Sequence, residues 1–107
     1  MKENYWEKIN FHSVDEEIRK INLLEDYISD QEKDGIIKAI KMKSELINSG
    51  FFIEHLKKKE FGKNHNYKFS ISKGPYTYAT AGNNYYLPVI EIYNWIKRSG
   101  DLKDESI

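Results

Sequence analysis

Apolar side chains recur at spacings of three and four residues in two neighbouring stretches of the first half of the chain. On a helix of 3.6 residues per turn, each set forms one stripe. The first stripe holds Val14, Ile18, Ile21, Leu24 and Ile28, and the second holds Ile36, Ile37, Ile40 and Ile47. Each stretch follows a Ser-x-x-Glu sequence, Ser13 to Glu16 and Ser29 to Glu32, which is typical of a helix-capping box. The pattern predicts two antiparallel helices, over residues 14–28 and from about residue 30 to residue 48.

A different pattern begins after Gly50. Residues 51–53 suit the start of a buried strand and also a helical turn, whereas residues 57–66 have the composition of a loop. Residues 67–71 alternate strictly between apolar and polar side chains, which predicts a half-buried strand with Lys68, Ser70 and Ser72 facing outward. A turn at residues 73–75 then leads to a second strand at residues 76–80. These segments together predict an antiparallel meander.

The last predicted element is a helix near Pro88, because proline cannot donate to a sheet and is pre-set for the first turn of a helix. Its inner stripe consists of Val89, Ile92, Tyr93 and Ile96, and Gly100 ends it. Residues 1–12 hold several large apolar groups and are expected to pack as an N-terminal arm, in a short helix or strap, whereas residues 101–107 are expected to fray. We predict an α+β fold with an N-terminal helical hairpin, a small antiparallel meander and a C-terminal helix.

Length and composition narrow the class of protein. The 107 residues are enough for one core, so we expect residues 1–107 to form a single domain. The absence of cysteine excludes a disulfide framework, a thiolate nucleophile and a zinc site that uses sulfur. The first residues lack the layout of a signal peptide, and no apolar run approaches the roughly 20 residues of a membrane span. We expect a soluble protein in the cytoplasm, the host cytoplasm if a phage encodes it.

The zero net charge hides a division along the chain. Residues 1–36 contain ten acidic and five basic side chains, whereas residues 37–80 contain nine basic and three acidic ones. Between Lys57 and Tyr86, six lysines are interleaved with seven aromatic residues. Lysines attract phosphates and exposed rings stack on bases, so this segment is the candidate surface for RNA or a partner. Its candidate residues are Lys57, Lys58, Lys59, Lys63, His65, Lys68, Lys73, Tyr76 and Tyr78.

The alternative for the same segment is structural, with tyrosines in the core and lysines that only solubilise. His12, His55 and His65 are too widely spaced for a standard metal site, and the glycines form no phosphate-binding loop. Only His65, in a basic loop, is placed by the sequence to act as an acid or base on RNA. We therefore predict no metal and no cofactor, and we assign no catalytic residue.

One resemblance rests on the stretch from Ile53 to Ile90, whose order of elements is similar to that of RelE-like ribonuclease toxins. Residues 56–58, 67–71 and 74–78 fall where such toxins have a basic loop and two strands. The resemblance implies an endoribonuclease, with His65 or Tyr78 as acid or base and lysines on the phosphate. Those toxins carry arginines on these strands, whereas the only arginines here are Arg19 and Arg98.

A charge-segregated chain without a catalytic constellation is expected to act by contact. The first hypothesis is a non-enzymatic binding protein or inhibitor from a phage or mobile element, which blocks a host nucleoprotein defence complex as anti-CRISPR proteins do. Its basic aromatic surface would contact RNA or an RNA-binding protein, and its acidic first helix would meet basic channel walls. A RelE-like endoribonuclease toxin and a phage structural or adaptor protein are the alternatives.

Overall fold

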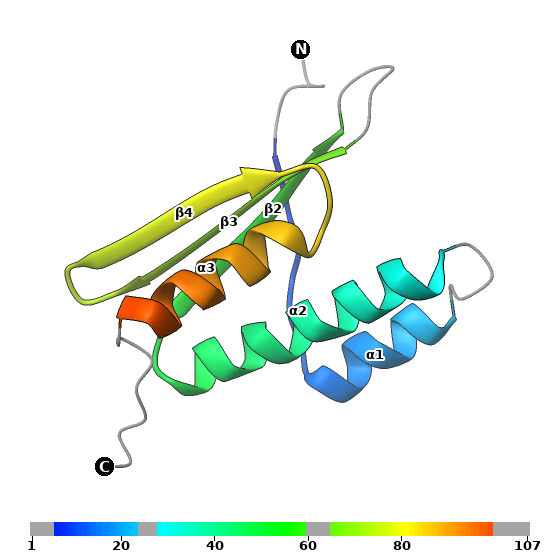
Figure 1. Ribbon diagram of the computed structural model, residues 1–107, viewed down its shortest axis with the longest axis horizontal. Helices are drawn as coiled ribbons and strands as arrows, with labels where there is room; N and C mark the ends of the chain where they lie inside the picture. Colours follow the sequence, from blue (N-terminus) through cyan, green and yellow to red (C-terminus); the bar gives the residue numbers. More distant parts are fainter. Residues whose placement is uncertain (1–5, 24–27, 60–64, 100–107) are drawn as a thin grey trace.

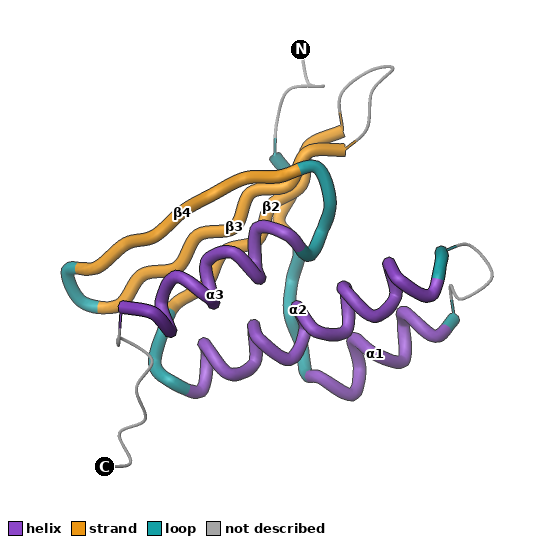
Figure 2. Tube along the Cα trace, viewed as in Figure 1, coloured by secondary structure: helices purple, strands orange, loops and turns teal. Residues whose placement is uncertain are grey.

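Three helices and one antiparallel sheet make up the computed structural model, which describes residues 6–23, 28–59 and 65–99. The elements follow in the order β1 (Glu7–Lys8), α1 (Val14–Asn22), α2 (Asp30–Asn48), β2 (Phe52–Lys59), β3 (His65–Lys73), β4 (Tyr76–Gly82) and α3 (Leu87–Ser99) (Figure 1). The strands lie in the sheet in chain order (Figure 2). This architecture confirms the predicted α+β fold with a helical hairpin, a meander and a closing helix.

The two predicted capping boxes are both formed. Ser13 Oγ accepts from the Glu16 backbone N–H, and Ser29 Oγ accepts from that of Glu32, each over 3.1 Å. The first helix is shorter than predicted, because α1 ends at Asn22 and the Leu23 N–H bonds to two carbonyls in the tightened geometry of a last turn. The predicted continuation through residues 24–27 lies outside the described residues. The predicted limits of α2 are correct.

The N-terminal arm packs on the body, but as a strand rather than the expected helix or strap. Glu7 lies opposite Lys57 and Lys8 opposite Leu56, and Ile9 N–H donates to His55 O over 2.8 Å. The arm therefore supplies an edge of the sheet. Apolar groups at the start of the chain gave no periodicity from which to infer this pairing.

The predicted loop at residues 57–66 is wrong over all of its described part, because residues 57–59 belong to β2 and residues 65–66 belong to β3. Lys57, Lys58 and Lys59 belong to β2, and they pair with Tyr67, Asn66 and His65 of β3. Clustered lysines suggested a loop, yet in a strand alternate side chains point to opposite faces. The ladder thus separates the lysines in space. Of the ambiguous residues 51–53, Phe52 and Ile53 are the first two residues of β2, so the strand alternative is correct there.

Helices α2 and α3 cover one face of the sheet (Figure 1). The core between them contains Ala39, Leu46, Phe51, Phe69, Ile71, Val89, Ile92 and Ile96. The alternation predicted for β3 is confirmed, because Phe69 and Ile71 are buried whereas Lys68 is exposed. We call the other side the open face, because no helix in the described residues packs on it.

The buried stripe of α2 differs from the predicted one. Ala39, Ile40, Lys43 and Leu46 are the buried residues of this helix, whereas Ile47 is 39% exposed. The prediction selected isoleucines and passed over a lysine that lies on the same stripe. Lys43 consequently places an ionisable group inside the core.

Candidate functional site

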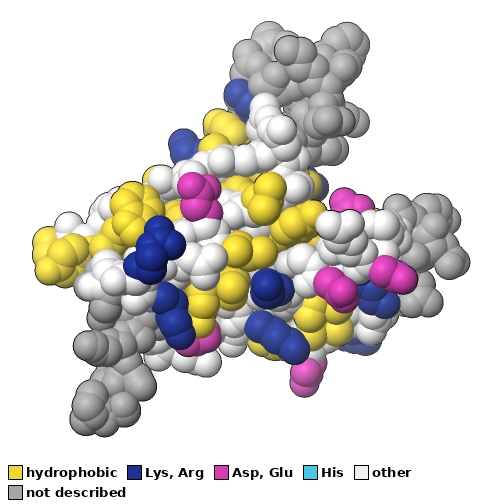
Figure 3. Space-filling view, in the orientation of Figure 1, with side chains coloured by type: hydrophobic (Ala, Val, Ile, Leu, Met, Phe, Trp, Pro, Cys, Tyr) yellow, Lys and Arg dark blue, Asp and Glu magenta, His cyan; other side chains and the backbone are white. Residues whose placement is uncertain are grey.

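The predicted binding residues do not share one surface. Lys57 lies directly opposite Tyr67 on the helix-covered face, whereas Lys58 and Lys68 belong to the open face by strand alternation. Lys63 and the side chains of Lys59 and His65 lie outside the described residues. On the side that carries the helices, basic groups are interspersed with acidic and hydrophobic ones (Figure 3).

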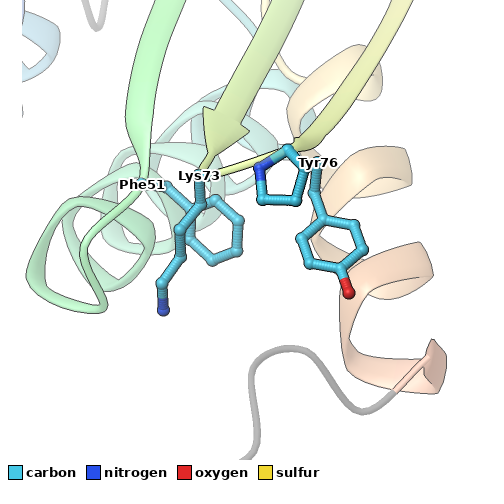
Figure 4. Close-up of a pocket in the computed structure, with 5 residues that line it drawn as sticks. Phe51, Lys73 and Tyr76 are labelled. Carbon is cyan, nitrogen blue, oxygen red and sulfur yellow. The ribbon is translucent and has the colours of Figure 1, made fainter.

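Lys73 lies at the far end of the sheet from Lys57 and Lys58. Its ammonium donates to Ser49 O over 2.8 Å and lies 5.1 Å from the centre of the Phe51 ring. Lys73, Phe51 and Tyr76 border a pocket of about 300 Å³ beside the β3–β4 turn (Figure 4). The Lys73 contact joins this turn to the C-terminal end of α2, where a positive charge is favourable.

The two predicted tyrosines differ in their surroundings. Tyr76 is 56% exposed at the start of β4. Tyr78 is half-buried and makes an edge-to-face contact with Trp95 of α3, with ring centres 5.2 Å apart. Tyr78 thus belongs to the packing between β4 and α3.

Two predicted lysines do meet, around a residue that the sequence analysis did not select. The Lys58 and Lys68 ammonium groups lie 5.0 and 5.5 Å from the centre of the Trp6 ring. The ring carries partial negative charge on its faces, which offsets the repulsion between two cations held close together. Of these three residues, which we call the lysine–tryptophan cluster, Lys68 is exposed and the other two are half-buried.

Around this cluster on the open face, the side chains of β3 and β4 are small, whereas β2 contributes Leu56 directly opposite Lys68. Ser70, Ser72, Thr77, Ala79 and Ala81 lie along the neighbouring strands of the same face. Among the described strand residues, Lys8 adds a positive charge to this face and Glu54 a negative one. The open face is therefore mainly positive and carries two large rings, Trp6 and the 69% exposed Phe52, which lies opposite Ser72.

A second polar cluster, which the sequence pattern does not predict, lies inside the core. Lys43 Nζ lies 2.9 Å from His55 Nδ1 and donates to Tyr85 Oη over 3.0 Å. It also lies 4.9 Å from the centre of the Tyr85 ring and 5.4 Å from that of Phe11. Lys43 and His55 are at most 1% exposed, so water does not solvate either side chain. We call Lys43, His55 and Tyr85 the buried lysine cluster.

Burial dominates the ionisation of these groups. It lowers the pKa of Lys43 from 10.5 to about 8, although the carboxylate of Glu17 opposes the change. Burial and then the Lys43 charge lower the pKa of His55 from 6.5 to about 3, and the backbone of Tyr85 opposes this. Burial, followed by the Glu17 charge, raises the pKa of Tyr85 above its ordinary value. At neutral pH the cluster is thus an ammonium between a neutral imidazole and a neutral phenol.

This arrangement determines the tautomer of His55. An ammonium only donates, so Nδ1 accepts from Lys43 and the ring proton resides on Nε2. Within the described residues, Nε2 meets no acceptor with hydrogen-bond geometry. The fully buried amine has no exposed surface on which to meet a reactant, so we assign the buried lysine cluster to the interior of the fold rather than to a reaction site.

A groove of about 820 Å³ lies next to this cluster, between the N-terminal arm and the first two helices. Tyr85 and Tyr67 line its sheet end, and Glu17 lines the helix side. The Glu17 carboxylate is nearly buried and accepts from the His12 N–H over 3.2 Å. Glu17 therefore joins the arm to α1, and its charge acts to raise the pKa of both Lys43 and Tyr85.

Three other kinds of feature bear on function beside these two clusters: metal sites, membrane spans and the acid or base that the toxin resemblance implies. In the parts of the chain that the structure describes, no group of three or more potential metal ligands is found. Among the same residues, no helix has both the length and the apolar character that a bilayer span requires. Tyr78, implied by the toxin resemblance as an acid or base, packs against Trp95.

Sequence signals for the two clusters differ. Lys43 lies three residues after Ile40 and three before Leu46, so helical spacing alone places it on the buried stripe. Trp6 had no such signal, because its position depends on pairing between β1 and β2, which are distant in the sequence.

No family model matches the chain, and searches of curated proteins and of solved structures find no similar protein.

Proposed function

We propose that this protein is a non-enzymatic binding protein that contacts single-stranded RNA through the open face of its sheet. The observation that carries the proposal is the lysine–tryptophan cluster, in which two ammonium groups flank the Trp6 ring at 5.0 and 5.5 Å. Ammonium groups bind phosphates, and an indole ring stacks on any base. The small residues that β3 and β4 place on this face leave room for a nucleic-acid strand to lie across that part of the sheet.

We propose inhibition as the biological setting of this contact, with the protein occupying RNA or an RNA channel of a host defence complex. The acidic start of α1, where Asp15 and Glu16 precede the nearly buried Glu17, supports a second contact with basic channel walls. This setting depends on the RNA contact. Tests of RNA binding therefore come first.

Tryptophan fluorescence provides a direct test, because Trp6 and Trp95 are the only tryptophans. In a Trp95→Phe background, adding a single-stranded RNA oligonucleotide should quench the emission of Trp6 by stacking. In a Trp6→Phe background, the emission of Trp95 on α3 should not change with RNA. Equal responses of the two variants would contradict stacking on Trp6.

Charge reversal tests the lysines. Lys58→Glu with Lys68→Glu should lower RNA affinity about a hundredfold, since each charge-assisted hydrogen bond contributes about 1.5 kcal/mol. The slope of log affinity against log salt should also become shallower by about 0.7 for each phosphate that the variant no longer neutralises. Lys38→Glu with Lys41→Glu is the matched control, because both lysines lie on α2, away from the open face. No binding at low salt by the unmodified chain would refute the RNA contact.

A further inference from the structure

The last strand of the sheet has an edge without the usual protection. β4 pairs with β3 on one side, and no strand among the described residues pairs with its other side. Edge strands in native proteins are commonly short, charged or interrupted by proline, which discourages pairing with another chain. β4 runs for seven residues, Tyr-Thr-Tyr-Ala-Thr-Ala-Gly, without a charge or a proline. The opposite edge, β1, is two charged residues long.

Exposed hydrophobic side chains follow this edge on its helix-covered side. Tyr76, at the start of β4, is 56% exposed, and Trp95, which contacts Tyr78, is 46% exposed. Leu87 is 52% exposed, and its Cβ lies 3.9 Å from where a Cβ on Gly82 would be. Tyr76, Trp95 and Leu87 thus mark the start, middle and end of β4. Hydrophobic groups are visible at the β3–β4 turn and along β4 (Figure 3).

We propose that β4 is a dimerisation edge, at which a second copy of this chain pairs antiparallel with it around a two-fold axis at Ala79. Ala79 is the central residue of the strand, so this register uses its whole length. Tyr76 then lies opposite Gly82 of the second copy, and Tyr78 lies opposite Thr80. The largest side chain at the start of the strand therefore meets the residue that has no side chain.

The exposed side chains Tyr76, Trp95 and Leu87 form a row beside β4. In this register, the row of one copy lies against the same row of the second copy. Tyr76 reaches Gly82 and with it Leu87 of the other copy, so two apolar contacts form by symmetry. Glu91 lies on α3 between Leu87 and Trp95, and Thr80 Oγ1 donates to its carboxylate over 3.3 Å. Because Tyr78 and Thr80 are opposed, Glu91 lies across from Trp95, whose indole N–H is a donor. The strand carries no charge, and the row beside it is complementary to its own copy. We therefore infer that the molecule at the free edge of β4 is a second copy of this chain rather than a charged peptide.

The dimer has a geometric consequence. A two-fold axis perpendicular to the sheet joins the two sheets edge to edge and keeps both open faces on the same side. The two lysine–tryptophan clusters then share one surface. The dimer itself depends only on β4 and α3, so it is independent of the proposed RNA contact.

Light scattering coupled to size-exclusion chromatography tests the association in nuclease-treated protein. We expect a species of twice the 12.7 kDa chain mass at micromolar concentration. Ala79→Lys should give a folded monomer, because the axis would bring two ammonium groups together. Ser70→Lys is the matched control, since Ser70 lies opposite Ala79 on the same face of the inner strand β3 and should keep the dimer. A monomeric unmodified chain, or a dimer that survives Ala79→Lys, would overturn the proposal.

A single cysteine tests the register, because the chain has none of its own. At the axis, directly opposite Cα atoms lie about 4.5 to 5.5 Å apart, within the range that a disulfide spans. Ala79→Cys should therefore form a covalent dimer rapidly on mild oxidation. Thr77→Cys should not, because its two copies would be separated by about 13 Å, roughly four residues along a strand. Equal rates for the two variants would refute the axis at Ala79, and circular dichroism would verify that each is folded.

Discussion

The Lys43 ammonium donates to Nδ1 of His55 across 2.9 Å inside the core, where neither side chain has more than 1% of its surface exposed. Two basic groups thus share one buried site, and burial makes a second positive charge there unfavourable. Lys43 keeps its proton at neutral pH and His55 remains neutral. Folding stability should consequently depend on pH at both ends of the scale.

At alkaline pH the protein should become more stable as Lys43 loses its proton. Between pH 8 and 10 the folded chain releases this proton while the unfolded chain retains it, because the pKa of Lys43 falls from 10.5 to about 8 on folding. The free energy of unfolding should rise by up to about 1.4 kcal/mol per pH unit. Urea unfolding at several pH values measures this. Above about pH 10 the trend should reverse, because folding raises the pKa of Tyr85 and Tyr67.

The control for this alkaline rise replaces a lysine on the same helix. Lys43→Met should abolish the rise, whereas Lys41→Met at an exposed position should preserve it. A rise that persists in Lys43→Met would mean that another group is responsible. Glu17 is the carboxylate that most directly modulates the effect, since its charge opposes the lowered pKa of Lys43.

At acidic pH the protein should lose stability as His55 is forced to bind a proton. Folding lowers the pKa of His55 from 6.5 to about 3, so between these values the unfolded chain binds a proton that the folded chain does not. Stability should fall by up to about 1.4 kcal/mol for each unit below the ordinary histidine pKa of about 6.5. In His55→Phe, the free energy of unfolding measured with urea should depend less steeply on pH across the mildly acidic range. Equal slopes for the variant and the unmodified chain would exclude His55 as the cause.

Local rules predicted the elements well, because caps and periodicity act within a few residues. Ser13 and Ser29 cap their helices as expected, and Phe69 and Ile71 point inward. The failures involve contacts between distant segments. Trp6 reaches Lys58 and Lys68 through the β1–β2 pairing, and no local pattern encodes that pairing.

The lysines show the same limit. Lys57 and Lys58 are adjacent in the sequence, yet the strand directs them to opposite faces, which a loop would not have done. For Lys43 the two local signals disagree, since a lysine favours the surface whereas helical spacing places it on the buried stripe. A lysine on a buried stripe is rare, and the position alone was the informative signal.

Removing the N-cap of α2 should destabilise the fold. Ser29→Ala leaves the Glu32 N–H without its 3.1 Å acceptor, and removal of such a cap costs about 1 kcal/mol. Thermal and urea unfolding should both register the decrease. Gln31→Ala is the control, because Gln31 is exposed in the same first turn and its replacement leaves the Ser29 hydroxyl in place. Its free energy of unfolding should stay within about 0.5 kcal/mol of that of the unmodified chain.

Gly35 should resist replacement because of space rather than backbone conformation. It lies inside α2, and a Cβ there would sit 2.8 Å from two atoms of the Tyr86 ring, which packs against the core. Alanine would gain about 1 kcal/mol of helix propensity, but overpacking costs about 1 to 3 kcal/mol. Gly35→Ala should thus lower the free energy of unfolding by about 1 kcal/mol. In a Tyr86→Ala background the ring is gone and the same change should stabilise, so a double-mutant cycle in urea decides whether the ring is the cause.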